Sequence, residues 1–267
     1  MKIWFQLVSS RKRLPNFLDA LQQQCDQAAA PGTVVEVHGT PNGALGDHYA
    51  SFLHFDADEI IRLLHTRVRP GSYDVYALAN SLDPALDALR ESLDIPVLSV
   101  LEVGCAVAPM LGDRFGLIVP NGKFIPKYRD LVAGYGRERQ LAGISPLQFD
   151  RIADHNAMFA DEAEARHTLD VVSDCARDLV NAGAEVIMAA GITACLLSKY
   201  QVTELHGARV LDMYSTLVKV SESMGYLAGH CGMTTSRVRR YKTPPAALMD
   251  EAVRTYRLDD TQPFGDT

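Results

Sequence analysis

The stretch YDVYALANSLDPALDALRESLDIPVLSV, residues 73–100, decides the fold class. An apolar run ends at Asn80 and Ser81, an amphipathic segment follows, and a second apolar run begins at Ile95. A buried strand, a helix and another strand in this order predict a parallel βαβ unit. In open α/β sheets, ligands bind beyond the carboxyl ends of strands. We therefore expect the small polar turn at residues 80–81 to face a ligand site.

The same alternation of short apolar runs and longer amphipathic segments continues along the chain, and it predicts an α/β fold with parallel sheets. The apolar runs are nearly continuous, as in strands that are covered on both faces. The predicted strands are residues 3–8, 34–38, 75–79, 96–100, 115–119, 186–190 and 209–211. The predicted helices are residues 16–29, 48–64, 84–93, 105–111, 125–132, 161–182, 194–201 and 216–229.

A second stretch, AEVIMAAGITACLLSKYQVTELHGARVLDM at residues 184–213, repeats the pattern of strand, small polar turn, helix and short strand. Matching units in the two halves of a chain indicate two similar lobes. Both turns, residues 80–81 and 191–193, follow predicted strands. We therefore expect the two turns to face one another across a cleft.

Composition excludes several classes of protein. The chain has 267 residues, of which 47% are hydrophobic, so it can bury a core without metal or disulfide bonds. The net charge is −7 and the basic tracts are short, which argues against nucleic-acid binding. Five cysteines without CxxC spacing indicate reduced thiols and a cytoplasmic protein. The apolar run at residues 3–8 is too short to span a membrane, so we expect no membrane association.

Common cofactor and metal motifs are also absent from the sequence. It contains no GxGxxG or GxxxxGK[ST] motif for nucleotides and no HxxEH or HxH spacing for a metal. It contains no GxSxG nucleophile elbow either. We therefore expect neither a nucleotide site nor a metal site.

Four segments together resemble the aspartate/glutamate/hydantoin racemase superfamily. They are DPALDALRESLDIPVL (83–98), LGDRFGLIVPNGKF (111–124), AGAEVIMAAGITACLL (182–197) and ARVLDMYSTLVKVSE (208–222). The loop VEVHGTPNGALGDHYASF, residues 35–52, resembles the hydantoin racemase-like branch. The resemblance implies two pseudo-symmetric Rossmann-like lobes, residues 1–112 plus 212–267 and residues 113–211, with the site between them. It also implies a homo-oligomer, such as a dimer, that needs no cofactor.

Racemases of this superfamily use two thiols, one on each face of the substrate. The first thiol motif resembles C-F-x-D-P-G-L, which here reads NSLDPAL and has Asn80 at the thiol position. The second motif resembles G-C-x-G, which here reads AGIT and has Gly191 at that position. Because neither residue can transfer a proton, we expect an isomerase or lyase that works through an enolate-like intermediate rather than two-thiol racemisation. Its substrate would be a small carboxylate or cyclic amide.

Proton transfer then needs another group. His48 titrates near neutral pH, Tyr49 beside it can donate a proton, and Asp47 can orient the imidazole. Cys195 lies about one helical turn after the second thiol position and is a candidate displaced thiol. Each of these side chains also has an ordinary structural interpretation, as a loop residue or as a small buried hydrophobe.

The remaining candidates would bind the substrate rather than move its proton. Amides, hydroxyls, an ammonium group and backbone N–H groups can hold a carboxylate or an enolate oxygen. The alternative interpretation of the same residues is helix capping and turn formation. The substrate-binding candidates are Gln6, Ser81, Asn121, Lys123, Gly191, Ile192 and Thr193, with Asn80 among the catalytic candidates.

Two other functions stay open from sequence. A cleft lined only by amides and hydroxyls would favour a non-catalytic binding protein for small acids. A hydrolase of a small ring or amide, with water activated by His48, is the third possibility.

Overall fold

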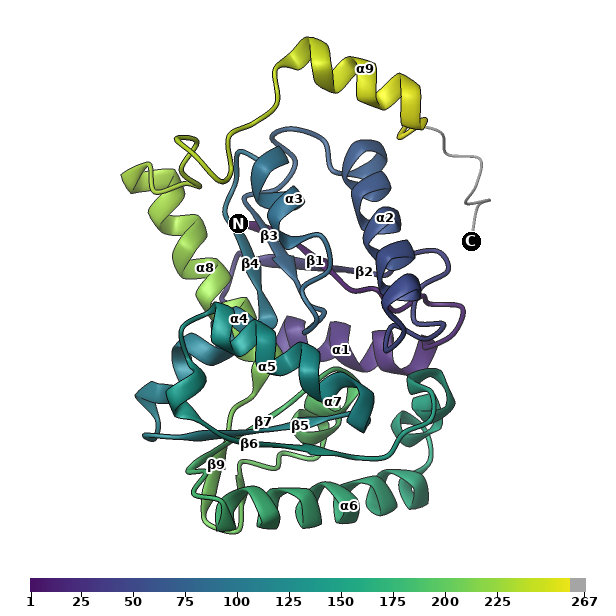
Figure 1. The fold of residues 1–267 in the computed structure, drawn as a ribbon, viewed down its shortest axis with the longest axis vertical. Helices are drawn as coiled ribbons and strands as arrows, with labels where there is room; N and C mark the ends of the chain where they lie inside the picture. Colours follow the sequence, from purple (N-terminus) through teal and green to yellow (C-terminus); the bar gives the residue numbers. More distant parts are fainter. Residues whose placement is uncertain (260–267) are drawn as a thin grey trace.

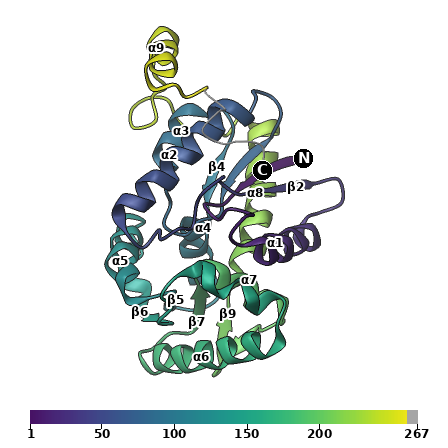
Figure 2. The ribbon, with the colours of Figure 1, turned by 90° about the vertical axis from the view of Figure 1, so that its right-hand side faces the viewer.

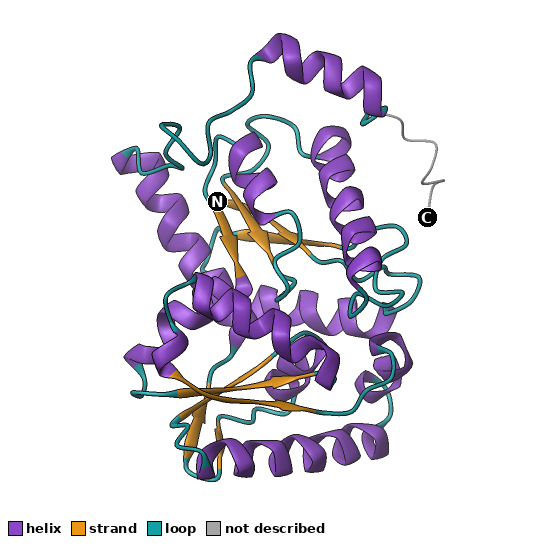
Figure 3. Ribbon diagram, in the orientation of Figure 1, coloured by secondary structure: helices purple, strands orange, loops and turns teal. Residues whose placement is uncertain are grey.

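The chain forms two β-sheets whose strands pair mainly in parallel, each with helices packed against it (Figures 1 and 3). The computed structural model describes residues 1–259, apart from the side chains of residues 152–154. The first lobe is built on a four-stranded sheet of order β2-β1-β3-β4. Its strands are β1 (Lys2–Gln6), β2 (Val34–His38), β3 (Val75–Leu78) and β4 (Val97–Ser99), and all pair in parallel.

The second lobe is built on a five-stranded sheet of order β6-β5-β7-β9-β8. Only the short strand β8 pairs antiparallel. The strands are β5 (Phe115–Val119), β6 (Leu141–Pro146), β7 (Val186–Ala189), β8 (Glu204–Leu205) and β9 (Ala208–Val210). All seven predicted strands are present, and the predicted α/β class with parallel sheets is confirmed.

Differences in burial explain why the sequence predicts β3 and β5 but not β6. Every residue of β3 and β5 is buried, because both strands lie inside their sheets and are covered on both faces. The edge strand β6 is half-buried along its whole length and includes Gly143 and Pro146. It therefore lacks a continuous apolar run, and the sequence did not predict it.

Nine α-helices connect and cover the strands within residues 1–259. The predicted helix at residues 105–111 is wrong in its bounds, since α4 starts directly after β4. The Ser99 hydroxyl caps it by accepting a hydrogen bond from the Glu102 amide. The helices are α1 (Pro15–Ala28), α2 (Ala50–Arg67), α3 (Leu86–Ser92), α4 (Val100–Val107), α5 (Ile125–Gly134), α6 (Glu162–Asn181), α7 (Ile192–Lys199), α8 (Met213–Cys231) and α9 (Ala246–Tyr256).

Helix α8 returns the chain to the first lobe. It packs against β3, α4 and α1, while α6 covers the far face of the five-stranded sheet (Figures 1 and 2). A Cβ atom added to Gly225 of α8 would lie 2.8 Å from a methyl group of Val75, so this glycine allows the close approach to β3. The division of the chain near residues 112 and 212 stays a prediction.

The segment after α8 crosses the end of the first lobe and leads into α9 (Figure 1). Arg237 donates hydrogen bonds to the carbonyl oxygens of Arg90 (2.5 Å), Glu91 (3.1 Å) and Leu93. Arg62 of α2 donates to the carbonyl oxygen of Arg257 at 2.9 Å. These bonds hold a C-terminal strap, residues 232–258, that the sequence did not predict.

Candidate active site

A pocket lies between the two lobes at the carboxyl ends of their central strands. The hollow and the open solvent at its mouth together span about 410 Å³ of space not filled by atoms. Residues that follow β1, β3, β5 and β7 supply most of its wall, as expected for α/β sheets. The lining residues are Leu7, Ser9, Phe17, Ala44, Asp47, Ala79, Asn80, Ser81, Leu82, Pro120, Phe124, Tyr128, Gly191, Ile192 and Tyr214.

The turn after β3 carries Asn80 and Ser81 into this pocket. The Asn80 side-chain oxygen accepts a hydrogen bond from the Leu82 amide at 2.9 Å, which is an Asx turn. The Ser81 hydroxyl lies 2.7 Å from the Tyr128 phenol oxygen of α5. The Asn80 amide group also hydrogen-bonds the carboxylate of Asp47, which lines the same pocket.

The turn after β7 carries Gly191 and Ile192 to the same pocket. Gly191 has φ 60° and ψ −140°, a conformation that residues with a side chain rarely adopt. Its carbonyl accepts a hydrogen bond from the Tyr214 phenol at 3.2 Å. Helix α7 begins at Ile192 without a side-chain cap, and the Ala194 N–H donates to the Gly191 carbonyl at 3.1 Å, so among its first N–H groups those of Ile192 and Thr193 are the candidate donors. The two predicted turns thus lie at one site.

Asp47 also lines the pocket, although the sequence singled it out only as a neighbour of His48. Its side chain is 5% exposed, and burial raises the pKa of its carboxyl to about 6. The Asn80 side-chain amide and the backbone amides of Asp47 and His48 hydrogen-bond this carboxylate and oppose that rise in pKa. No local sequence pattern records this burial, because it depends on how the loop before α2 folds against the segment after β1.

That loop is fixed by contacts with the chain segment after β1. The Thr40 hydroxyl donates a hydrogen bond to the carbonyl oxygen of Val8 at 2.7 Å. A Cβ atom on Gly43 would overlap this same carbonyl oxygen, at 1.8 Å. Close packing of backbone on backbone therefore brings Asp47 inward.

His48 and Tyr49 lie beside the pocket rather than in its lining. The centre of the His48 ring lies 4.2 Å from the centre of the Tyr49 ring and 5.9 Å from that of Phe124, and Phe124 does line the pocket. Burial, and to a smaller extent Lys123, lowers the pKa of His48. The Lys123 ammonium lies 5.1 Å from the centre of the exposed Tyr49 ring.

Gln6 and Asn121 are engaged in local structure. The fully buried Gln6 side chain accepts a hydrogen bond from the Trp4 indole at 2.8 Å and donates to the Leu7 carbonyl at 2.7 Å. Asn121 accepts a hydrogen bond from the Lys123 amide and donates to the Phe149 carbonyl, each at 3.1 Å. Neither side chain contributes to the pocket lining.

Thr193 and Cys195 follow the second turn on α7 and are buried. The Thr193 hydroxyl has no hydrogen-bond partner within the described residues. Cys195 faces a depression beside α1 rather than the pocket, and burial raises the pKa of its thiol. The structure therefore gathers Asn80, Ser81, Gly191 and Ile192 in the lining, together with Asp47.

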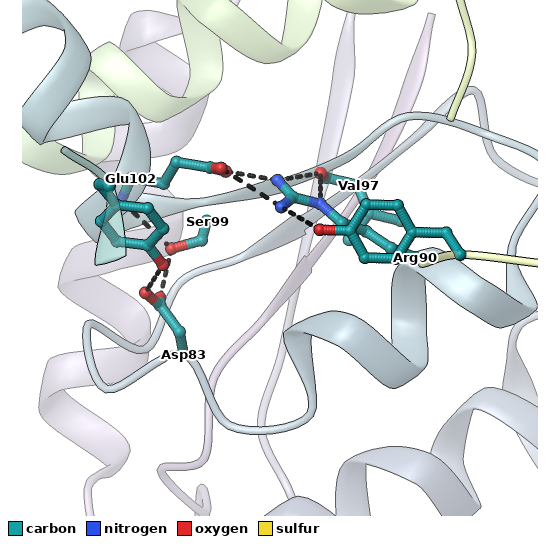
Figure 4. Close-up of polar contacts among 7 residues, drawn as sticks. Asp83, Arg90, Val97, Ser99 and Glu102 are labelled. Atoms are coloured by element: carbon teal, nitrogen blue, oxygen red, sulfur yellow. Dashed lines mark hydrogen bonds and ion pairs between the residues drawn. The ribbon is translucent and has the colours of Figure 1, made fainter. Parts of the chain in front are cut away.

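A polar network beside the pocket secures the first turn (Figure 4). The Asp83 carboxylate accepts hydrogen bonds from the Ser99 hydroxyl and from the Tyr135 phenol, which belongs to the second lobe. Burial raises the pKa of Asp83 to about 6, against the opposing effect of these two donors. Arg90 forms an ion pair with Glu102 in the same network. The network ties the start of α3 to α4 and to the end of α5.

Within residues 1–259, the described side chains and helices offer neither a metal cluster nor a membrane span. Among the side chains that the structure describes, no group of three or more His, Cys, Asp or Glu could hold a metal ion. No helix in this range has the length and apolar character that crossing a membrane requires.

Comparisons with known proteins agree with the predicted resemblance. Hydantoin racemase of Paenarthrobacter aurescens is 26% identical over 241 residues, which cover 86% of this chain and 94% of that protein. Hydantoin racemase of Rhizobium meliloti is 29% identical over 171 residues. That match covers 64% of this chain and 66% of the relative, slightly less than two thirds of its length.

Solved structures show the same two-lobe fold. Allantoin racemase from Klebsiella pneumoniae has a TM-score of 0.73 at 20% identity and covers 91% of this chain and 94% of its own. Allantoin racemase from Pseudomonas fluorescens has a TM-score of 0.74 at 20% identity, with coverage of 91% and 97%. The sequence model described as Asp/Glu/Hydantoin racemase matches residues 16–220, and the chain therefore belongs to this enzyme family.

Proposed function

We propose that this protein is an isomerase that moves a proton on a small cyclic amide through an enolate-like intermediate, without a pair of catalytic thiols. One observation carries the proposal. The pocket between the lobes joins Asn80 and Gly191, the positions at which the family resemblance implies thiols, and no cysteine is among its described lining residues. The pocket lies between the lobes, where the family resemblance implies the active site, but it presents an asparagine and a glycine at the two thiol positions.

Stabilisation of an enolate oxygen is the chemistry that these groups support. The hydroxyl of Ser81, the amide nitrogen of Asn80 and the first N–H groups of α7 are hydrogen-bond donors from the two lobes. Donors held in place for a developing oxyanion are each worth about 2.7–4 kcal/mol of barrier. A donor set of this kind needs no organic cofactor, and it would serve a lyase that cleaves a bond to the same carbon equally well.

The charge of the pocket favours a neutral ring over a free carboxylate. Among its described lining residues none is Lys, Arg or His, and Asp47 carries the one carboxylate. A substrate carboxylate would place a second negative charge in a low-dielectric site without a counter-ion, which is costly. A cyclic amide avoids this cost, and the relatives and neighbours above are named hydantoin and allantoin racemases.

Proton exchange in D2O tests the proposal directly. The purified protein is incubated with single enantiomers of 5-methylhydantoin and allantoin, and with aspartate and maleate as carboxylates. NMR follows loss of the carbon-bound proton, and a protein-free sample gives the spontaneous rate. We expect exchange above that rate with a cyclic amide, slowed at least tenfold in Ser81→Ala. Saturable binding without exchange would instead support a binding protein, and ring opening would support a hydrolase.

A further inference from the structure

We infer that the Asp47 carboxylate is the catalytic group that takes the proton from substrate carbon and returns it. This inference rests on the proposed function and gives its chemistry an acid–base residue. It replaces His48 and Cys195, the side chains that the sequence favoured for this role. Neither of those two lines the pocket, whereas Asp47 does.

Asp47 has the position that a base requires. It lines the pocket together with Asn80, and it is the one described lining residue that ionises near neutral pH. The phenols of Tyr128 and Tyr214 also line the pocket, but burial raises the pKa of both, so they stay neutral. Other candidates for a base in the lining are hydroxyls and amides, which do not ionise in this range.

Asn80 holds this carboxylate in place. Its amide nitrogen donates to Asp47 while its oxygen is tied to the Leu82 amide, so the side chain cannot turn freely. Asparagine at the first thiol position therefore becomes a positioning residue for a base supplied by another loop. Asparagine in place of the thiol and the inward position of Asp47 therefore go together, because the Asn80 side chain hydrogen-bonds the Asp47 carboxylate.

The ionisation of Asp47 suits this task. Burial brings its pKa to about 6, so at pH 7 most molecules carry the base form, yet the protonated form is accessible. Two titratable groups on neighbouring helices interact with it, namely Asp56 of α2 and Tyr128 of α5. The negative charge of Asp47 raises the pKa of Asp56, after the larger effect of burial.

The step balances without another reactant. The carbon–hydrogen bond breaks, its proton goes to a carboxylate oxygen of Asp47, and its electron pair enters the enolate. The negative charge moves from Asp47 to the enolate oxygen, where donors of the lining accept it. Return of the proton from the neutral carboxylic acid to another atom of the enolate system gives the isomer, whereas return to the same carbon gives back the substrate and is read as exchange. The pocket carries one negative charge throughout, in agreement with its lack of lining cations.

The test uses the exchange assay with 5-methylhydantoin and three variants. Asp47→Asn keeps the shape of the side chain but removes the base, and we expect exchange to fall at least 100-fold while ligand affinity stays within about threefold. Asp56→Asn is the matched control, because it removes a neighbouring buried charge outside the lining, and its exchange should stay within threefold. His48→Ala tests the competing base. Circular dichroism and melting temperature verify that each variant is folded.

The pH profile adds a second readout. Exchange by the wild type should fall below about pH 6, where Asp47 becomes protonated. Residual exchange in Asp47→Asn should lack this acidic limb. Wild-type rates in Asp47→Asn, or loss of exchange in His48→Ala alone, would overturn the assignment of Asp47 and leave the proposed function intact. Absence of exchange in the wild type with every ring compound would overturn both.

Discussion

The Ser81 hydroxyl and the Tyr128 phenol lie 2.7 Å apart, and their hydrogen bond joins the turn after β3 to helix α5 across the wall of the pocket. Both side chains are buried, and each belongs to a different lobe. The bond therefore fixes a candidate substrate donor and helps to hold the two lobes together.

Tyr128→Phe should lower the stability of the protein and loosen the Ser81 hydroxyl. Removing the phenol oxygen breaks a buried hydrogen bond, which typically costs about 1 kcal/mol of unfolding free energy. For a chain of this size the melting temperature should fall by roughly 2–4 °C, as measured by calorimetry. Because Ser81 loses its partner, KM for a ring substrate should also rise. An unchanged melting temperature would show that the hydroxyl pair contributes nothing to stability.

Gly191→Ala should destabilise through backbone strain alone. An added Cβ atom has no neighbour within 4 Å, but the φ of 60° is unfavourable for alanine. Such strain costs roughly 1–3 kcal/mol, measured by urea unfolding. Gly122→Ala is the matched control, since Gly122 also has open space around it but no left-handed backbone. Equal effects of the two substitutions would rule out the strain argument.

Asp56→Asn should stabilise the protein at alkaline pH and have little effect near pH 4. Burial, with the charges of Asp47 and Glu59, raises the folded-state pKa of Asp56 from 3.8 to about 7. The folded state then holds the proton of Asp56 more tightly than the unfolded state, so the contribution of this group to stability is most favourable below pH 4 and falls as pH rises towards 7. Removing the charge in Asp56→Asn should raise the free energy of unfolding by roughly 2–4 kcal/mol at pH 8. The exposed Asp58 of the same helix gives the control, and a pH-independent effect of Asp56→Asn would contradict the prediction.

Stereochemistry offers a separate check on the single carboxylate. If Asp47 alone moves the proton, it approaches the ring carbon from one face. Deuterium should then enter L- or D-5-methylhydantoin faster than the centre inverts, as followed by NMR and chiral chromatography. Inversion as fast as exchange would require a second proton donor on the other face.

Arg237→Ala should release the C-terminal strap. The guanidinium group bonds carbonyl oxygens at the end of α3, and these bonds would be lost together. Hydrogen exchange followed by mass spectrometry should show faster exchange across residues 232–256. Arg240→Ala is the comparison, because its ion pair with Asp87 is exposed and contributes little. Equal protection in wild type and Arg237→Ala would mean that other contacts hold the strap.

The sequence predicted the elements whose burial leaves a local pattern. β5 matches its predicted bounds, because a strand covered on both faces reads as a short apolar run. The edge strand β2 also matches its bounds, although Val35 is its one buried residue. The convergence of Asn80 and Gly191 was also predictable, since both follow parallel strands. The half-buried β6 leaves a weak pattern and was missed, and so was the peripheral α9, in which no residue is buried.

The acid–base group was harder to find for a different reason. His48 has the better intrinsic pKa and stands next to Asp47 in the chain, so residue chemistry alone favours it. The choice between them depends on which side chain the loop turns inward, and contacts of Thr40 and Gly43 with Val8 decide that. Such contacts join segments about 30 residues apart, and no local pattern records them.

The return of α8 to the first sheet sets an order for assembly during synthesis. The strands of the second lobe, β5 to β9, lie in one uninterrupted stretch of chain, so that sheet can form as soon as it leaves the ribosome. The strands β1 to β4 emerge earlier, but the face of β3 that α8 covers stays open until residue 231 has been made. The half of the protein that is translated first is therefore the last to be completed, and its uncovered sheet is the surface that a chaperone would have to shield.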